Sequence, residues 1–502
     1  MRRLLLIPLV LLALLLAGCG GGDDSGSALD SSLSYLPKDA PFAVAIDTDL
    51  EGDQYEALQA LVKKFPFGGQ LQDSLRQQLE QGSDVDFNDD VKPMLGNPLV
   101  VGGTGAPLIT SSSGGAGFVG AIQAKDKGAL DDLIDKTKPK KTGEESGATL
   151  YEENGTVFAV KDDTVIFAGD EQQLTQALKR ADGDNHLDET AFNKGLEGLP
   201  GSALVRVYTD LEALLKSDPG TDSARNIRWV DALRTLGLTV VAKSDSIDVD
   251  FRVRTDGDLT DADLPIAPGD EAPDVIKRDG EVGLGIRDLA HIVKFAESAG
   301  QAVDQAGFGD YAKAKATIDK QLGVSLDDDL IGQLTGNVSA SISLDGKFGV
   351  RADLKDPQAF ERTLAKVADV LPSFAEGAGF GTVRLSKPKG SQKFYALAQP
   401  DGDGVVFGVI DDVLVVANDP ARADELASAQ PTAVSGAKGS VVLSADAKQI
   451  VTALLGQFGP AFGLGDFGGL GGALFTRPLG DLNGFISAST DELRGKFTLA
   501  ID

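Results

Sequence analysis

The sequence predicts an α+β fold of two homologous halves, each a mainly antiparallel sheet with helices on one face. Three observations lead to this prediction. Short apolar runs bounded by glycine, proline or aspartate alternate with segments whose apolar residues have helical spacing. Tight turns join neighbouring runs, which favours antiparallel pairing. The same blocks then recur in the same order roughly 230–250 residues further along the chain, which is the signature of an internal repeat.

The strands and helices of the first half can be assigned in order. Apolar runs with strand character lie at 42–46, 99–101, 118–123, 156–160, 164–168, 203–208, 238–242 and 247–253. Helical spacing is found at 54–65 and 127–136, and two further helices follow Asp170 and begin near Asp210. The runs on either side of Asp162-Asp163 predict a two-residue hairpin, and Asp170 is a good N-cap residue.

The second half repeats these blocks. The clearest match pairs 157–170 (VFAVKDDTVIFAGD) with 406–419 (VFGVIDDVLVVAND). Weaker matches pair 87–97 with 326–337, 120–126 with 349–356, 201–204 with 439–442, and 240–242 with 486–488. The segment between the halves, 256–274, has the composition of turns and a linker. We therefore place the first repeat at 35–255, the linker at 256–274 and the second repeat at 275–502.

The N-terminus has the pattern of an export signal. Two arginines precede an apolar run, Leu4–Leu16, which is shorter than the roughly 20 residues that a membrane-spanning helix needs. Small residues then lead to Cys19, the only cysteine of the chain. The ending Leu16-Ala17-Gly18-Cys19 resembles the lipobox of bacterial lipoproteins, which implies cleavage after residue 18 and a diacylglyceryl group on the Cys19 thiol. We expect a signal peptide at 1–18 and a lipidated flexible tether at 19–34.

The lipid anchor decides the expected location. Stable membrane attachment needs at least two acyl chains, and a lipidated cysteine supplies them. We therefore expect the protein on the extracytoplasmic face of the cell membrane, attached through Cys19. The formal net charge of −29 disfavours nucleic acid and anionic headgroups as partners, because both carry negative charge themselves.

Motifs for catalysis or for metal binding are weak throughout. The two histidines, His186 and His291, lie at non-equivalent positions in different halves. The segment 84–90 has the alternating oxygens of a calcium loop, but it lacks the glycine and the glutamate that such a loop requires. The segment 463–468 fits G-x-G-x-x-G, but it lies inside a glycine-rich tract rather than between a strand and a helix. We expect no enzyme activity, no cofactor and no metal.

Aromatic residues suggest one candidate surface. Before its last hairpin, each half makes an excursion that the other half does not match: 216–236, with the only tryptophan, and 456–474, which is rich in glycine. Aromatic side chains on such backbone could form the rim of an apolar groove, although they could also belong to the core. The residues of this candidate rim are Trp229, Phe458, Phe462, Phe467 and Phe475.

The whole layout resembles a family of actinobacterial lipoproteins known as domain of unknown function 3352 (DUF3352). The resemblance rests on the lipobox, on the opening Tyr35–Pro41 (YLPKDAP), and on the Asp-Asp hairpin that is followed by Ala168-Gly169-Asp170. It implies no activity and no site residues. We expect a non-enzymatic lipoprotein that binds an apolar or lipid-like ligand or an envelope protein. The alternatives are a structural spacer of the envelope or a hydrolase that uses carboxylates.

Overall fold

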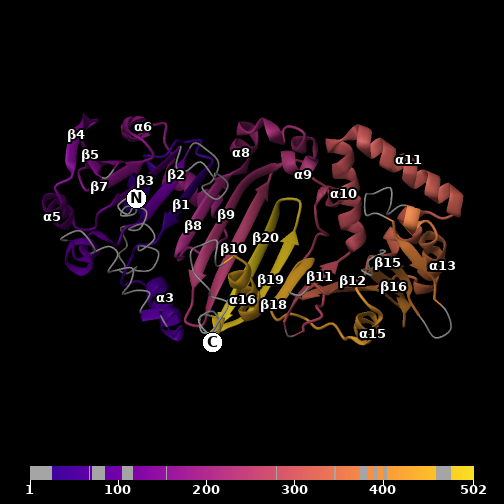
Figure 1. The fold of residues 1–502 in the computed structure, drawn as a ribbon. Helices are drawn as coiled ribbons and strands as arrows, with labels where there is room; N and C mark the ends of the chain where they lie inside the picture. Colours follow the sequence, from indigo (N-terminus) through magenta and orange to yellow (C-terminus); the bar gives the residue numbers. More distant parts are fainter. Residues whose placement is uncertain are drawn as a thin grey trace. The chain divides into compact units, whose positions relative to one another are not determined.

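A computed structural model describes residues 25–66, 68–69, 85–103, 117–153, 155–278, 280–343, 346–373, 382–388, 393–398, 404–458 and 476–502 (Figure 1). The chain divides into two compact units. Unit 1 comprises Met1–Pro219, Leu233–Arg254 and Ala500–Asp502, and unit 2 comprises Gly220–Ala232 and Thr255–Leu499. Both units combine helices with antiparallel strands, so the predicted α+β class is confirmed.

Unit 1 contains one run of ten antiparallel strands. They are β1 (Phe42–Ile46), β2 (Leu99–Gly103), β3 (Phe118–Gln123), β4 (Lys140–Glu145), β5 (Ala148–Glu153), β6 (Thr156–Lys161), β7 (Thr164–Ala168), β8 (Val205–Asp210), β9 (Leu233–Ala242) and β10 (Ser246–Thr255). The pairings give the order β4-β5-β6-β7-β3-β2-β1-β8-β9-β10. The predicted hairpin at Asp162-Asp163 is confirmed, since Lys161 pairs with Thr164 across it.

Most helical elements of unit 1 begin at an aspartate cap. The elements are α2 (Ser25–Leu33), α3 (Asp53–Lys64), η1 (Phe87–Val91), η2 (Lys92–Met94), α5 (Lys127–Thr137), α6 (Glu171–Ala181), α7 (Glu189–Gly195) and α8 (Leu211–Ser217). Aspartates N-cap five of these elements, with side chains that accept backbone N–H groups: Asp86, Asp126, Asp170, Asp188 and Asp210. A carboxylate at an N-cap satisfies free N–H groups and interacts favourably with the helix dipole.

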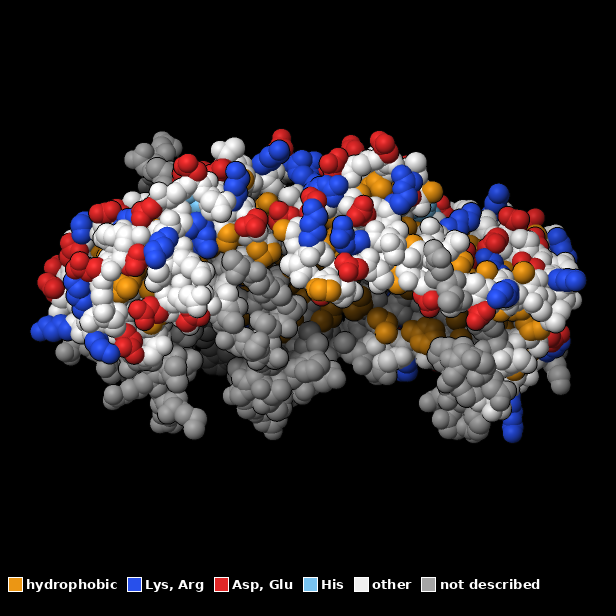
Figure 2. Space-filling model, turned by 90° about the horizontal axis from the view of Figure 1, so that it is seen from above, with side chains coloured by type: hydrophobic (Ala, Val, Ile, Leu, Met, Phe, Trp, Pro, Cys, Tyr) orange, Lys and Arg blue, Asp and Glu red, His pale blue; other side chains and the backbone are white. Residues whose placement is uncertain are grey.

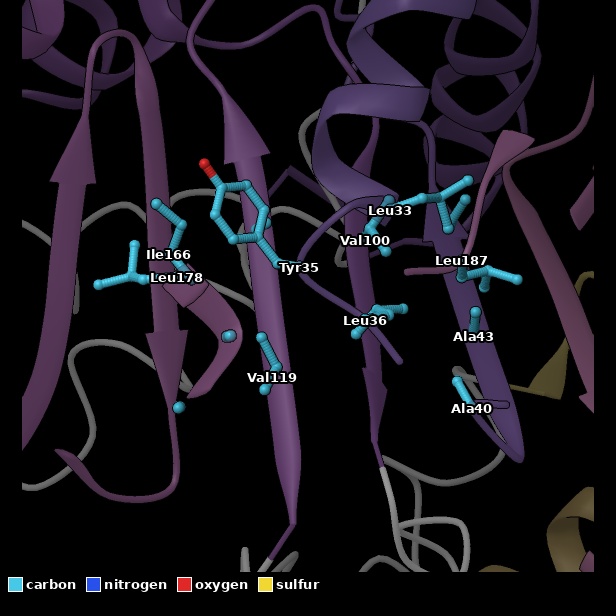
Figure 3. Close-up of a cluster of buried hydrophobic side chains, with 14 of the residues drawn as sticks. Leu33, Tyr35, Leu36, Ala40, Ala43, Val100, Val119, Ile166, Leu178 and Leu187 are labelled. Atoms are coloured by element: carbon cyan, nitrogen blue, oxygen red, sulfur yellow. The ribbon is translucent and has the colours of Figure 1, made fainter. Parts of the chain in front are cut away.

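The sheet of unit 1 is covered by helices on both faces, whereas the sequence predicted helices on one face only. Along β2, Val100 belongs to the cluster that contains α2, α6 and α7 side chains, whereas its neighbours Leu99 and Val101 belong to the cluster of η1 and α5. Successive side chains of a strand point to opposite faces, so both faces of this strand are apolar and both need cover. Figure 3 shows Leu33 and Tyr35 packed with side chains of the central strands.

Unit 2 contains ten strands in a corresponding arrangement. They are β11 (Glu281–Arg287), β12 (Asn337–Ser343), β13 (Phe348–Asp353), β14 (Arg384–Ser386), β15 (Tyr395–Ala398), β16 (Gly404–Ile410), β17 (Val413–Ala417), β18 (Val441–Asp446), β19 (Leu479–Ala488) and β20 (Glu492–Ile501). Their order is β14-β15-β16-β17-β13-β12-β11-β18-β19-β20. The hairpin at Asp411-Asp412 joins β16 to β17.

The helices of unit 2 include a long pair. The elements are η4 (Ala224–Asn226), α9 (Arg228–Asp231), η5 (Asp261–Asp263), α10 (Leu289–Val303), α11 (Gln305–Leu322), α12 (Leu326–Asp329), η6 (Ile331–Gln333), α13 (Pro357–Ala368), α15 (Pro420–Ser428) and α16 (Ala447–Phe458). A further short element, η3 (Pro219–Thr221), begins at the boundary between the units. Aspartates again serve as caps, at Asp288, Asp304, Asp356 and Asp419.

The N-terminal segment, residues 25–41, differs from the expected tether. From Ser25 it forms helix α2, in which Leu29 and Leu33 are 1% and 0% exposed. It then crosses β2, where the Leu36 side chain lies 2.5 Å from the place that a Cβ on Gly102 would occupy. Only glycine permits this approach. The signal for a buried helix was the pair Leu29 and Leu33, which are four residues apart in an otherwise mostly polar segment.

The linker segment, residues 256–274, is likewise packed onto its own unit. Its Leu264 is 0% exposed, and so is Val275 directly after it, which forms an isolated β-bridge with Thr432. A Cβ on Gly283 would lie 2.6 Å from the Val275 side chain, so this glycine too allows a close crossing of the sheet. The turn-rich composition of the segment therefore does not make it a free linker.

Charged side chains of both signs are interspersed over the face seen in Figure 2. Within the described part of the chain, no helix combines the length and the apolar character that a membrane crossing requires.

Candidate functional site

Of the six residues that the sequence suggested, the structure describes the environment of one. Cys19, Phe462, Phe467 and Phe475 lie outside the described residues. Phe458 is the last residue of α16, and its side chain also lies outside them. Trp229 is described, and it lies on α9 in unit 2. The proposed rim of five aromatics therefore stays a prediction, and Trp229 is its one member whose surroundings the structure describes.

The helix that carries Trp229 is fixed to the linker segment. Arg228 Nη1 lies 2.8 Å from Asp263 Oδ2, and Arg228 Nη2 donates to the Asp258 carbonyl at 2.5 Å. The Asp256 N–H donates to the Ala232 carbonyl at 2.8 Å. These contacts explain why residues 220–232 belong to unit 2, although the sequence placed them inside the first repeat.

Trp229 has a polar group without a partner. Its side chain is partly buried, and its Nε1 is inaccessible to solvent and has no hydrogen-bond acceptor in the described structure. An indole N–H can only donate, so no alternative role satisfies it. Leaving a buried donor unsatisfied costs about 1–3 kcal/mol, and such groups are few in native proteins. An acceptor supplied by a ligand or a partner would remove this cost once the side chains that cover the indole N–H had moved to admit it.

Helix α10 lies beside this segment. It contacts both η4 and η5, and His291 Nε2 on its first turn lies 2.9 Å from the Leu264 carbonyl oxygen of the linker segment. Among the described side chains of α10 and α11, only Ala290 is fully buried. Val303 and Tyr311, near the connection of the two helices, are 42% and 41% exposed. The pair α10 and α11 therefore exposes apolar side chains of a kind that would be buried on a core helix.

A polar network holds α11 in place. Lys315 Nζ lies 2.7 Å from Glu297 on α10, and it also pairs with Asp327 on α12. Tyr311 donates to the same Glu297 carboxylate at 2.7 Å. Burial alone would lower the pKa of Lys315, but the hydrogen bonds to Asp327 and Glu297 outweigh it and raise that pKa above its ordinary value.

Two neighbouring carboxyl groups form a second candidate site, in unit 1. Asp47 and Asp49 follow directly on β1, and the Asp49 N–H donates to Asp47 Oδ1 at 2.9 Å. Burial raises the pKa of Asp47 and, together with the Asp47 charge, that of Asp49. Arg206 on β8 lowers the pKa of Asp47 without reversing the shift.

The family-model comparison gives the chain its family. The model described as "Protein of unknown function (DUF3352)" matches residues 4–372, which is most of the chain. The chain is a DUF3352 protein. No curated protein matches it.

Among solved structures, three crystal forms of the protein TP0453 (III, IV and I) are similar to the chain, with 11%, 12% and 12% identity. These matches cover 46%, 44% and 46% of this chain and 81%, 80% and 80% of the other, with TM-scores of 0.25, 0.26 and 0.24.

The remaining candidate ligands of this DUF3352 protein have structural roles. His186 is in a polar loop, where its Nδ1 lies 2.7 Å from the Gly183 carbonyl oxygen. In the calcium-like segment, Asp86 caps η1, and Asp90 accepts the Asp86 N–H at 2.6 Å. Among the described residues, no group of three or more His, Cys, Asp and Glu side chains is placed so that it could hold a metal.

The Asp47–Asp49 pair was not predicted from the sequence. The apolar run at 42–46 identified the strand, but not the partial burial of both carboxyl groups that follow it. The available signal was a pair of aspartates, with one residue between them, at the end of a predicted strand.

Proposed function

We propose that this DUF3352 protein is a lipoprotein anchored through Cys19 on the extracytoplasmic face of the cell membrane, and that it binds an apolar or lipid-like ligand or an envelope protein without catalysing a reaction. The anchor rests on the lipobox-like sequence that ends at Cys19. Replacing Cys19 with Ser should release the protein from the membrane fraction. A variant that stays in the membrane after a high-salt wash would contradict the anchor.

Trp229 is the observation that carries the binding proposal. Its unpartnered Nε1 lies on the short helix α9, which packs on η4, and η4 in turn contacts the incompletely buried helix α10. An apolar partner with one acceptor oxygen or nitrogen would satisfy the indole N–H and cover apolar side chains at the same time. A protein partner could supply the same chemistry through a backbone carbonyl.

The test uses the fact that Trp229 is the only tryptophan. Native mass spectrometry of protein extracted with its lipids should show an additional bound mass. The Trp229 emission should shift when that mass is removed and recover when it is added back. In Trp229→Phe the bound fraction should fall, whereas a Tyr151→Phe control in unit 1, which keeps its ring, should bind normally. Protein that carries neither a ligand nor a co-purified partner would favour a structural spacer.

We also propose that the two units arose by duplication. Their strands pair in the same order, and two aspartate-capped helices of each unit occupy corresponding places: α5 and α13 follow β3 and β13, and α6 and α15 follow β7 and β17. Two stacked ring pairs correspond as well: Tyr151 and Phe158 lie 5.2 Å apart on β5 and β6, and Tyr395 and Phe407 lie 5.4 Å apart on β15 and β16. Within each pair, the two residues are direct partners on neighbouring antiparallel strands.

The segments before the first strand of each unit support the same proposal. Leu187 donates its N–H to the Leu36 carbonyl at 3.0 Å, and Thr432 donates its N–H to the Val275 carbonyl at 2.9 Å. In each unit, therefore, the segment before the first strand forms an isolated β-bridge with the loop after a helix. That helix is α6 in unit 1 and α15 in unit 2. An experimental structure in which the Asp162 and Asp411 hairpins had unrelated topologies would contradict the duplication.

A carboxylate-based hydrolase is the competing proposal, and the raised pKa values of Asp47 and Asp49 are the observation that favours it. A general acid has to hold its proton at the working pH, and burial favours this. If a hydrolytic activity is detected, it should be lost in Asp47→Asn and kept in Asp39→Asn, an exposed carboxyl nearby in the sequence. Loss in both variants, or in neither, would exclude Asp47 as the acid.

A further inference from the structure

We infer that the surface of unit 1 formed by α2 and α7 faces the membrane that holds the anchor. This inference rests on the proposed acylation of Cys19. It goes beyond that proposal, because it specifies which side of unit 1 is held next to the lipid headgroups.

The first step is the length of chain between lipid and fold. Helix α2 begins at Ser25, so five residues, and therefore six Cα–Cα steps, separate Cys19 from the first residue of the fold. Because an extended chain spans at most about 3.5 Å per residue, this connection cannot exceed about 21 Å. A tether that lasted to residue 34 would have allowed more than twice this reach.

The second step is that α2 is fixed to unit 1. The Leu29 and Leu33 side chains lie in the core cluster of this unit. The Asp30 carboxylate accepts the Glu189 N–H at 2.8 Å, which joins α2 to the start of α7. Beyond the helix, Arg180 Nη1 donates to the Tyr35 carbonyl at 2.6 Å. Lengthening the connection by unwinding α2 would expose the leucines and break these hydrogen bonds.

The third step compares this reach with the size of unit 1. A domain of about 220 residues has a radius of gyration of about 17 Å, and therefore a diameter of more than 40 Å. The connection is about half of this diameter. Helix α5 packs on the other face of the sheet, with Ile134 in the cluster opposite to that of Leu29 and Leu33. The α2–α7 surface is therefore held closer to the bilayer than α5.

Charge does not provide an alternative explanation for this orientation. Asp30, Asp188 and Glu189 lie where α2 meets α7, and acidic groups are not attracted to phosphate headgroups. The short connection alone would hold this surface near the membrane, which makes the orientation dependent on chain length.

Single-cysteine labels can test the orientation, because the chain has no cysteine besides Cys19. Two variants of the full acylated chain are compared: Thr190→Cys, exposed on α7, and the matched control Asp132→Cys, exposed on α5. Each carries the same fluorophore and is placed in phosphatidylcholine vesicles that contain a lipid with a quencher on its headgroup. Residues 190 and 132 lie on helices that cover opposite faces of the sheet, and each packed layer adds about 10 Å to their separation. We therefore expect quenching of the label at 190 to exceed that of the label at 132 by about twofold or more.

A longer connection provides the second measurement. Inserting 20 Gly/Ser residues after Gly22 raises the maximum reach to about 90 Å and should bring the ratio of the two quenching values close to one. Equal quenching in the protein without the insertion, or stronger quenching at 132, would overturn the inference and leave the anchor intact. Protein that does not float with vesicles and lacks the acyl mass on its N-terminal peptide would overturn the proposed anchor together with the inference.

Discussion

Replacing Leu33 with Ala tests whether the N-terminal segment belongs to the fold. Leu33 is 0% exposed and packs in the main core cluster of unit 1. A buried Leu→Ala substitution costs about 2–5 kcal/mol, because it removes transfer free energy and leaves a cavity. In a domain of this size, each kcal/mol lowers the melting temperature by about 2–4 °C. From the middle of both ranges, we expect Leu33→Ala to lower the melting temperature of unit 1 by about 10 °C.

The assay is calorimetry of the mature chain with Ser in place of Cys19, so that no lipid is attached. The matched control is Lys38→Ala, an exposed position in the same segment, which should change the melting temperature by no more than about 2 °C. Equal melting temperatures for Leu33→Ala and the parent chain would refute the reasoning, because the segment would then be a tether in solution.

Three further predictions concern ionisable groups. Arg422 is 7% exposed and pairs with Glu281, so Arg422→Met should cost about 3–5 kcal/mol in urea unfolding, and adding Glu281→Leu should recover most of this loss. Because burial raises the pKa of Asp47, its ionised form opposes folding, and the folded state gains stability as the pH falls through that pKa. Asp47→Asn should therefore stabilise the protein at pH 7 but not at pH 3; a loss at pH 7 would contradict this. Burial, then the Asp162 charge, raises the pKa of Tyr35 to about 12. The free energy of unfolding should therefore be constant below about pH 10 and should fall by about 3 kcal/mol as the pH rises to 12, because the unfolded chain ionises first. Tyr35→Phe, which has no hydroxyl to ionise, should not show this fall.

Local patterns predicted eight of the ten strands of unit 1, but not β4 and β5. The runs on either side of Asp162-Asp163 form β6 and β7, and the helix expected at 54–65 is α3 at Asp53–Lys64. These features depend on residues close together in the sequence. The positive φ of Asp162, at 53°, is a conformation that aspartate tolerates better than most side chains, which is why Asp-Asp identified the turn.

Features that depend on distant residues were not predictable in this way. The burial of Leu29 and Leu33 requires the strands around Val100 and Val119, so composition alone suggested a tether. The anchoring of Trp229 requires Arg228 to meet Asp263, 35 residues further along the chain. Likewise, the raised pKa of Asp47 results from burial at the end of a strand, which the sequence does not specify.

The aspartate N-caps change what the acidity of this protein means. Asn caps a helix about as well as Asp, so hydrogen bonding alone does not require a charged residue at these positions. A carboxylate adds about 0.3–1 kcal/mol at each helix start by its interaction with the helix dipole. Part of the net charge of −29 is therefore distributed over the starting points of the helices. Neutralising it with Asn would weaken each helix slightly, whereas neutralising it with Ala would remove the caps as well.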